Sequence, residues 1–431
     1  MLIRLPYGDQ IQEADVSWGR CLGVLDIAEA PGLADIPRAV RTAIEQPIGM
    51  DGSLLAHVRR DESVLIVVSD SFRYTGADRF LPPLLDALAE RGVRDADVRL
   101  IFATGTHRSP TESEQERILG PEVYARFRRQ LVLHHPHDAG CLAFAGTTSR
   151  GTRVYINRLV QESAHVIVTG AVVLHYFGGF GGGRKSIVPG LAGVETIAHN
   201  HALNLHPFEP RLDPAVRIGA LDGNPVAEDM LEATRLCRVT GIVNTVLNRH
   251  GEIVNIFAGE LDAAHRAAAQ CARALYAVSI EQPADLVIAS AGNARNFVQS
   301  HKALFNAFQA MRPGGRLVFL AACPEGLGGN KLQRWLSLGS REAVIAELRK
   351  NAEINGQTAL STLEKAPSAF MVTELDAGQT ALLGARKAAS LSDALDHARS
   401  ELAAAGNPNP TYYVMPSAAY TVPFVTPRNV T

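Results

Sequence analysis

The chain has 431 residues, 46% of them hydrophobic, and its 42 basic and 44 acidic side chains leave a net charge of -2. This balance argues against nucleic acid as the main partner, and no stretch approaches the roughly 20 apolar residues of a membrane span. The five cysteines lie far apart without a Cys-x-x-Cys pair, and the first residues lack the apolar run of a secretory signal, so we expect a cytoplasmic protein without disulfides that binds neither nucleic acid nor a membrane.

Five apolar runs predict buried strands, because continuous apolar character is what burial on both faces of a sheet requires. The runs cover residues 63–69, 98–104, 165–174, 284–290 and 316–321, and helical patterns such as 79–90 and 302–311 lie between them. This alternation predicts an α/β fold. The chain is also longer than one ordinary domain of roughly 100–200 residues, which favours two domains.

We therefore expect two α/β domains with mainly parallel sheets and the active site in the cleft between them. The N-terminal domain should cover residues 1–275, and the C-terminal tail 407–431 should return to it as a strand. The C-terminal α/β domain should cover residues 280–405. The segment 273–283 should form the crossing between the two domains.

Polar or glycine-rich segments follow four of the predicted strands directly. These segments read SDSFR, GTHR, HYFGGFGGGRK and AGNARN in chain order. In parallel sheets, ligands bind at the carboxyl ends of the strands, where loops and helix N-termini converge. We therefore expect the four segments to meet in one site.

The third segment has five glycines, at positions 178, 179, 181, 182 and 183, between His175 and Lys185. Glycine lets backbone N–H groups approach an anion closely, so a strand followed by such a loop is a candidate phosphate cradle. A flexible loop explains a generic glycine run equally well, but Arg184 and Lys185 favour the cradle. The nucleotide-binding P-loop has a related pattern without the extra arginine, so a phosphate-binding or NTP-dependent α/β protein stays open as an alternative.

Several histidines are candidate chemical groups. His107 and His175 lie at strand ends and suit a general acid/base pair, because imidazole titrates near neutral pH. His199 and His201 are expected near the start of a helix. A further group, His134, His135 and His137, has no carboxylate or cysteine at helical spacing, and we interpret it as a solvated surface turn.

Three polar residues are candidate anion binders. Arg73, near Asp70, can bind a carboxylate or phosphate with two parallel hydrogen bonds. Gln299 and Lys302 are expected on one face near a helix start, where a lysine opposes the helix dipole and is more plausible as an anion binder. The sequence Arg312-Pro-Gly-Gly-Arg316 is similar to a methyltransferase turn, but we interpret it as a helix stop, a tight turn and a strand start.

The combined pattern resembles the lactate racemase family. The matching segments are SDSFR (69–73), ATGTHR (103–108), HYFGGFGGGRKSIVPGLAG (175–193), HNHAL (199–203) and QSHKAL (299–304), in the family's order. The spacings from His175 to Lys185 and from Lys185 to His201 also follow the family pattern. The resemblance implies an isomerase, a racemase or epimerase of 2-hydroxy acids that depends on a nickel-pincer nucleotide supplied by cofactor biosynthesis enzymes.

The resemblance also implies roles for individual residues. Lys185 would carry the cofactor, a pyridinium mononucleotide with two sulfur arms, through a thioamide, and His201 would complete the nickel coordination. His107 and His175 would take turns as base and acid on the substrate hydroxyl. The cofactor would be cradled by Asp70, Ser71, Phe72, Arg73, Gly179, Gly181, Gly182 and Gly183. The substrate carboxylate would be bound by Arg73, Gln299 and Lys302.

The chain departs from the family pattern next to the expected substrate. Tyr74 follows Arg73, where a proline is usual, and the loop 291–299 lacks the usual Pro-Lys-Asp and has Val298 in place of a tyrosine. Arg295 stands in this loop and adds positive charge around the carboxylate. A dicarboxylate would balance that charge, so the sequence predicts a larger or more acidic 2-hydroxy acid than lactate, with malate as the first candidate and Arg295 as a further substrate-binding residue; lactate or another 2-hydroxy acid stays open as an alternative.

Overall fold

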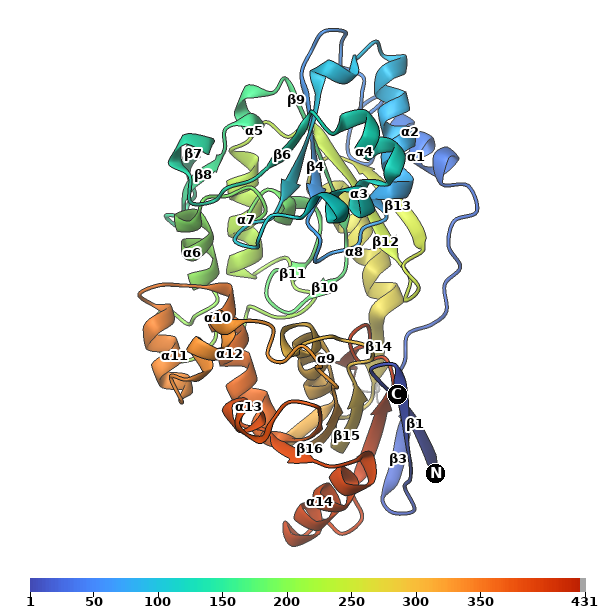
Figure 1. Cartoon of the computed structure of the whole chain (residues 1–431), viewed down its shortest axis with the longest axis vertical. Coiled ribbons are helices and arrows are strands. Elements are labelled where there is room, and N and C mark those ends of the chain that lie inside the picture. Colours follow the sequence, from blue (N-terminus) through green and yellow to red (C-terminus); the bar gives the residue numbers. More distant parts are fainter. Residues whose placement is uncertain (427–431) are drawn as a thin grey trace, which may run out of the picture. The chain divides into compact units, whose positions relative to one another are not determined.

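The computed structural model describes residues 1–426 and divides the chain into two compact units (Figure 1). One unit is formed by Glu29–Leu275. The other unit combines Met1–Ala28 with the chain from Tyr276 onward. Both units are α/β structures with a mainly parallel six-stranded sheet, which confirms the predicted fold class. No helix in the described residues is both long and apolar enough to cross a membrane.

The unit 29–275 contains a sheet with the strand order β13-β12-β9-β4-β5-β6. Its strands are β4 (Val64–Ser69), β5 (Val98–Ala103), β6 (Leu131–Leu133), β9 (His165–Ala171), β12 (Gly241–Leu247) and β13 (Ile253–Gly259). All neighbours run parallel except β12 and β13, which form an antiparallel hairpin. This unit also contains two small antiparallel pairs. They are β7 (Leu142–Thr147) with β8 (Arg153–Asn157) and β10 (Leu174–His175) with β11 (Gly179–Phe180).

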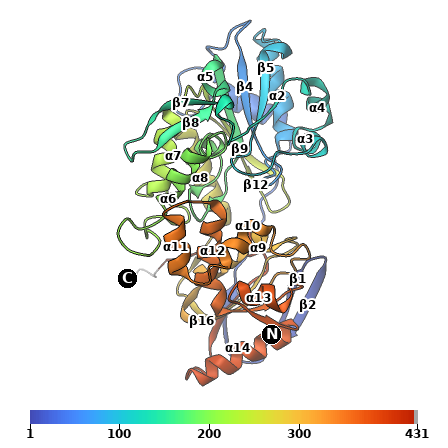
Figure 2. The ribbon, with the colours of Figure 1, turned by 60° about the vertical axis from the view of Figure 1, so that its left-hand side comes forward.

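Helices cover both faces of this sheet (Figure 2). They are α1 (Ile36–Glu45), α2 (Ala77–Glu90), α3 (Glu112–Leu119), α4 (Pro121–Phe127), α5 (Leu159–Glu162), α6 (Val194–Ala202), α7 (Pro225–Arg235) and α8 (Ala263–Tyr276). In β4, Ile66 packs with Leu84 of α2, whereas the next residue, Val67, packs in the core that contains Met230 of α7. The strand is therefore buried on both faces, as its continuous apolar sequence predicted.

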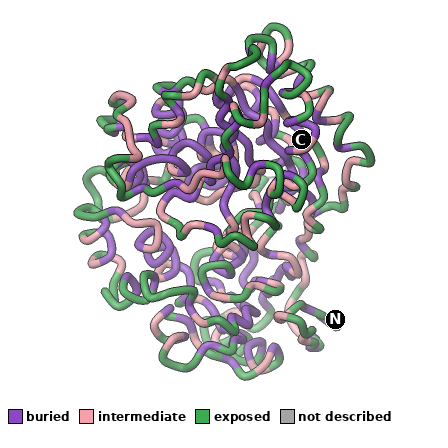
Figure 3. Tube along the Cα trace, turned by 45° about the horizontal axis from the view of Figure 1, so that its top comes forward, coloured by how far each residue is buried: buried purple, intermediate pink, exposed green. Residues whose placement is uncertain are grey.

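The second unit has an all-parallel sheet with the order β18-β17-β16-β15-β19-β3. Its strands are β3 (Arg20–Val24), β15 (Ala284–Ser290), β16 (Met311–Leu320), β17 (Ala369–Val372), β18 (Arg386–Ala388) and β19 (Thr411–Met415). Two further pairs are β1 (Leu2–Tyr7) with β2 (Gln10–Asp15) and β14 (Ala277–Ile280) with β20 (Val422–Val425). Its helices are α9 (Phe297–Gln309), α10 (Asn330–Leu336), α11 (Arg341–Leu348), α12 (Ile354–Lys365), α13 (Ala377–Leu382) and α14 (Leu391–Ala404). In Figure 3, buried residues lie mainly in the interior of the trace and exposed residues mainly at its periphery.

Three expectations about the chain's organisation are wrong. The tail 407–431 does not return to the unit 29–275 within the described residues, because β19 pairs with β15 and β3 in the other sheet. The first 28 residues also belong to that sheet's unit, through β3. Strand β16 begins at Met311 rather than at 316, because Met311 already pairs with Ala284; residues 312–315 then bulge out of the register, and continuous pairing with β15 resumes at Arg316.

Candidate active site

The three central strands of the unit 29–275 bring together three of the four predicted segments, whereas the fourth, AGNARN, follows β15 in the other unit. Strands β9, β4 and β5 are neighbours and run parallel, so their carboxyl ends lie along one edge of the sheet. Asp70 follows β4 directly, and His107 lies in a turn after β5 that is closed by a hydrogen bond from His107 N–H to the carbonyl of Thr104. The loop after β9 carries His175. This edge is where α/β sheets bind ligands.

His107 is held by a buried carboxylate. Its Nδ1 lies 2.5 Å from Oδ2 of Asp70, which is 3% exposed, and Oδ1 of Asp70 accepts a hydrogen bond from the N–H of Phe72. A carboxylate only accepts, so Nδ1 carries a hydrogen and Nε2 of the neutral ring is bare. The contacts give Asp70 a role that the sequence did not predict, the orientation of His107, while its expected contact with a cofactor stays a prediction.

His175 and Lys185 are joined by a hydrogen bond. Nε2 of His175 lies 2.9 Å from Nζ of Lys185, and Nδ1 of His175 accepts hydrogen bonds from the N–H groups of Phe177 and Gly178. Lys185 is half-buried. Burial, and then the positive charge of Arg73, lower the pKa of Lys185 well below its ordinary value. The lysine predicted as the tether is therefore held next to one of the two predicted acid/base groups.

The glycine loop is packed tightly within its own unit. A Cβ on Gly179 would lie 2.0 Å from the carbonyl oxygen of Ala220, and one on Gly183, whose φ is +49, would lie 2.5 Å from Cδ2 of His265. Gly181 is also buried, and its carbonyl bonds to Nε2 of the same histidine. Glycine is therefore required here by the close approach of the protein's own atoms, and the expected phosphate contacts of Gly179, Gly181, Gly182 and Gly183 stay predictions.

The side chain of Arg184 contacts other residues of its own unit instead of facing a ligand. The side chain is 2% exposed, lies 2.8 Å from Oδ1 of Asp262 and 3.2 Å from Nδ1 of His265, and approaches the carbonyl of Ala227. The sequence argument that counted Arg184 in favour of a phosphate cradle is therefore wrong, because this guanidinium is used inside the unit.

His201 lies in the last turn of α6, not near the start of a helix as expected. Its ring is 2% exposed and packs against Phe177, with 4.7 Å between ring centroids. Burial, followed by the nearby charge of Lys185, lowers the pKa of His201 to about 3. The imidazole is therefore neutral at physiological pH, which is the form that binds a metal ion.

A buried network that sequence reasoning missed fixes α6. Asp229, which is fully buried, accepts hydrogen bonds from Thr148, Thr152 and Nδ2 of Asn200. Thr152 also lies 2.8 Å from Nδ1 of His199. His199 and Asn200 come directly before His201 on α6. The network therefore sets the rotation of the helix that carries His201. The sequence signal that could have revealed this network is Asp229 itself, an acidic residue within the apolar pattern of α7.

The SDSFR segment contains two features that suit an anion. The hydroxyl of Ser71 is buried and has no hydrogen-bond partner within residues 1–426, and buried polar groups normally have one. The N-terminus of α2 follows at Gly76 without a side-chain cap, which leaves backbone N–H groups available. Phe72 and Arg73 are exposed beside it.

The predicted substrate residues of the other unit cluster around the start of α9. Gln299 is in the first turn, and its Oε1 accepts a hydrogen bond from the N–H of Arg295. The guanidinium of Arg295 lies 3.1 Å from a carboxylate oxygen of Glu325, and both side chains are exposed. Nζ of Lys302 lies 5.9 Å from the ring centroid of Tyr420. Arg295 therefore has an acidic partner in its own unit.

The histidine group at 134–137 is only partly a solvated turn. His135 and His137 are exposed, but His134 is 1% exposed, with Nε2 bonded to the carbonyl of Ala192 and Nδ1 to Asn157. Burial lowers the pKa of His134 to about 4. The expectation is wrong for His134, because tertiary contacts that the local sequence does not reveal turn it inward.

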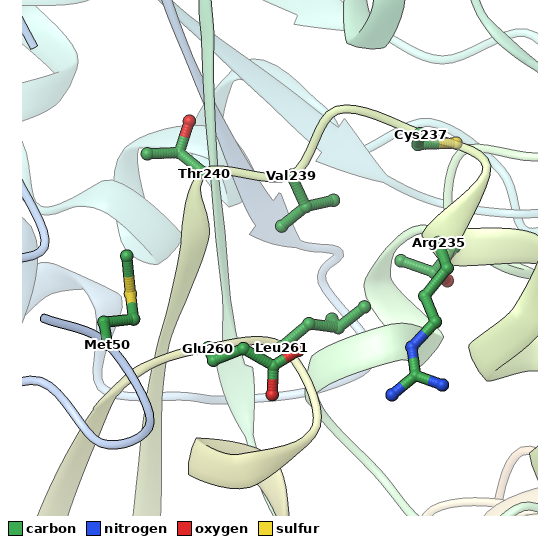
Figure 4. Close-up of a pocket in the computed structure, with 8 residues that line it drawn as sticks. Met50, Arg235, Cys237, Val239, Thr240, Glu260 and Leu261 are labelled. Carbon is green, nitrogen blue, oxygen red and sulfur yellow. The ribbon is translucent and has the colours of Figure 1, made fainter. Parts of the chain in front are cut away.

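A pocket on the unit 29–275 is lined by none of the predicted site residues (Figure 4). It has a volume of about 220 Å³ and is lined by Met50, Thr234, Arg235, Cys237, Val239, Thr240, Glu260 and Leu261. Glu260 uses a carboxylate oxygen to cap the start of α8. The described residues also contain no group of three or more histidine, cysteine or acidic side chains able to hold a metal ion by themselves.

Comparison with known proteins gives concordant matches. The family model described as "Lactate racemase N-terminal domain" matches residues 7–211. A lactate racemase from Thermoanaerobacterium thermosaccharolyticum is 31% identical over 338 residues, which is 77% of each chain. One from Lactiplantibacillus plantarum is 31% identical over 294 residues, 67% of each chain. The structure of the lactate racemase apoprotein from Thermoanaerobacterium thermosaccharolyticum superposes with a TM-score of 0.87 at 26% identity, over 98% of this chain and 100% of that chain.

Proposed function

Because the chain belongs to the lactate racemase family, we propose that it is an isomerase that interconverts the stereoisomers of a 2-hydroxy acid. The observation that carries this proposal is the pairing of each candidate acid/base histidine with a partner that sets its protonation. His107 is paired with Asp70, and His175 with Lys185. Racemisation needs a proton-transfer group for each of the two stereoisomers, and two such histidines meet that need.

We further propose that the chain binds the nickel-pincer nucleotide of the family, made by separate biosynthesis enzymes. The residues present fit this group. Lys185 is placed as a nucleophilic amine, His201 is a neutral imidazole, and the unpaired Ser71 hydroxyl can donate to a phosphate oxygen. The described residues build no metal site alone, so the other donors would come with the cofactor. When bound, the cofactor would accept a hydride from C2 of the substrate and return it to either face.

The chain's own residues would move the hydroxyl proton. In the cofactor-free protein the two rings, when neutral, are set oppositely: His107 carries its hydrogen on Nδ1, towards Asp70, whereas His175 carries its hydrogen on Nε2 because its Nδ1 accepts two backbone N–H groups. We propose that His107 accepts the hydroxyl proton while Nε2–H of His175 donates a hydrogen bond to the substrate oxygen. For the other stereoisomer the two would exchange roles, which requires His175 to give up its main-chain contacts at Nδ1 so that Nε2 is bare. Arg73, Gln299 and Lys302 remain the proposed partners of the substrate carboxylate.

We propose malate as the first substrate to test. The support is Arg295, together with the small Val298, in the loop where the family pattern differs. Arg295 is paired with Glu325, so a second substrate carboxylate would have to replace that of Glu325. Glu325→Gln should therefore lower the KM for malate and leave the KM for a monocarboxylate unchanged. Lactate and other 2-hydroxy acids are the alternatives.

The experiment is a substrate panel with enzyme from a host that makes the cofactor. Enantiopure lactate, malate, phenyllactate and sugar acids are incubated separately, and the products are resolved by chiral chromatography. Appearance of the opposite stereoisomer of any one acid supports the isomerase proposal. Absence of conversion for the whole panel, by protein whose nickel content and intact mass show a bound cofactor, would contradict it. Fast conversion of lactate and none of malate would refute the substrate proposal alone.

The alternative of an NTP-dependent or phosphate-binding protein has less support. A phosphate cradle of the P-loop type needs open backbone N–H groups and a cation at the loop. Here the guanidinium of Arg184 contacts Asp262 and His265 instead of a ligand. The side of Gly179 where a Cβ would project faces the protein's own backbone. Isothermal titration with ATP provides the check, and we expect no binding.

A further inference from the structure

The contacts of His175 allow its hydrogen positions to be assigned. Nδ1 accepts hydrogen bonds from the N–H groups of Phe177, at 3.2 Å, and Gly178, at 3.1 Å. A hydrogen on Nδ1 would point at these two donors, so the ring carries its hydrogen on Nε2. Backbone N–H groups cannot reverse their role, and the tautomer is therefore fixed by the main chain.

This assignment determines the state of the bonded lysine. Nε2 of His175 lies 2.9 Å from Nζ of Lys185, and an N–H needs a lone pair to donate to. An ammonium group has only hydrogens, whereas an uncharged amine has one lone pair. The contact is therefore satisfied only when Lys185 is uncharged. Burial and the charge of Arg73 favour the same state, since both lower the pKa of the amine.

We propose that His175 has a second function before catalysis: it holds Lys185 as an uncharged, oriented nucleophile for attachment of the cofactor, and is released to the substrate when attachment is complete. This inference rests on the proposed function for the identity of the attached group. Thioamide formation joins Nζ to the carbon of a thiocarboxyl arm. A C–N bond forms, a C–O bond breaks, and the oxygen leaves as water with one hydrogen from the amine and one from the acid.

Attachment would also change what His175 can do. The nitrogen of a thioamide is conjugated with the C=S group and no longer offers a lone pair. Nε2–H of His175 would then lose its acceptor and become available to the substrate oxygen. The same imidazole would thus serve attachment first and catalysis afterwards, and the cofactor-free protein would keep one of its two acid/base groups engaged.

The test uses the cofactor-free full-length protein and a small amine reagent. Lys185 is the only lysine in the first 301 residues, and Lys350, whose side chain is 75% exposed, serves as an internal reference. Trace acetic anhydride is added at a series of pH values, and mass spectrometry of peptides gives the acetylation rate at each lysine. The pH at which the rate levels off reports when each amine is uncharged. It does not depend on how easily the reagent reaches that amine. The groups that act on Lys185 are His175, Arg73 and His201.

We expect acetylation of Lys185 to level off at a lower pH than that of Lys350. His175→Phe, which cannot donate, should reduce the neutral-pH rate at Lys185 by about tenfold, equivalent to about one pKa unit. His175→Gln, which keeps an N–H donor, should recover part of the rate. His107→Phe is the matched control, because it removes an imidazole bonded to Asp70 instead, and it should leave the rate unchanged.

Three results would overturn the proposal. If Lys185 and Lys350 show the same pH dependence, the lysine is an ordinary ammonium. If His175→Phe leaves the Lys185 rate unaltered, burial alone sets its state. The third test is nitrogen-15 NMR of the histidine rings, which uses the unaltered protein and so does not depend on the folding of a variant. A hydrogen on Nδ1 of His175 would reject the tautomer assigned above. None of these measurements uses racemase activity, so a failed substrate panel would leave them standing, and their failure would not touch the proposed reaction.

Discussion

Replacement of Asp70 by asparagine tests how the protein prepares His107. The substitution keeps the size of a side chain that is 3% exposed but removes the charge 2.5 Å from Nδ1 of His107. The amide oxygen can serve only one of the two present donors, Nδ1–H of His107 or the N–H of Phe72. If its NH₂ group faces Nδ1, the hydrogen of the ring moves to Nε2, and His107 can no longer accept a proton there.

The size of the effect follows from this geometry. A hydrogen bond to a charged group contributes about 1.5–3 kcal/mol, and His107 is 37% exposed, so we take the lower half of that range because water screens the charge. This corresponds to a fall of about 13- to 45-fold in kcat/KM. Reversal of the tautomer would remove the general base altogether and extend the loss towards about 10⁴-fold.

The assay measures racemisation by chiral chromatography and divides the rate by the cofactor content from intact mass and nickel analysis. Asp95→Asn is the matched control, because it removes a carboxylate that pairs with Arg126 at 2.7 Å on the surface of the same unit. Asp70→Asn should keep its cofactor and lose turnover, while the control keeps both. Turnover within twofold of the unaltered enzyme would refute the orienting role. Loss of the cofactor instead of turnover would support the cofactor contact predicted from sequence.

Three further predictions follow from individual contacts. His201→Ala should lose bound nickel, measured by mass spectrometry of the metal, whereas His107→Ala should keep it; equal nickel in both would remove His201 as a ligand. Gly183→Ala should lower the free energy of unfolding in urea by about 2–4 kcal/mol, because it combines a φ of +49 with a Cβ 2.5 Å from His265, and an unchanged unfolding midpoint would contradict the packing described. The folded-state pKa of His134 is about 4 and its ordinary value is 6.5, so its stabilising effect is complete above about pH 6.5 and is lost as the pH falls towards 4, by about 3 kcal/mol. His134→Gln should flatten the pH dependence of unfolding in that window, and an unaltered slope would show that His134 does not cause it.

The sequence alone determined the fold class and the edge at which the candidate site lies. Runs such as 64–68 and 286–289 are apolar throughout, a pattern typical of strands buried on both faces of a sheet, so these strands could be predicted closely. The segments that follow them contain the candidate residues because loops at strand ends are free of the sheet's packing demands. These properties depend on residues close together in the chain, and they can therefore be read locally.

Partners distant in the chain were decided by the tertiary structure. Nothing near Asp70 in sequence indicates that it serves His107, and nothing near Arg184 indicates that it is enclosed by Asp262. Strand β19 likewise pairs with β15. The sequence could not predict this partner, because an apolar strand can pair with any open edge of suitable register. The pKa depends on burial in the same way: Lys185 is an ordinary lysine in sequence, and only its enclosure and the nearby charge of Arg73 lower its pKa.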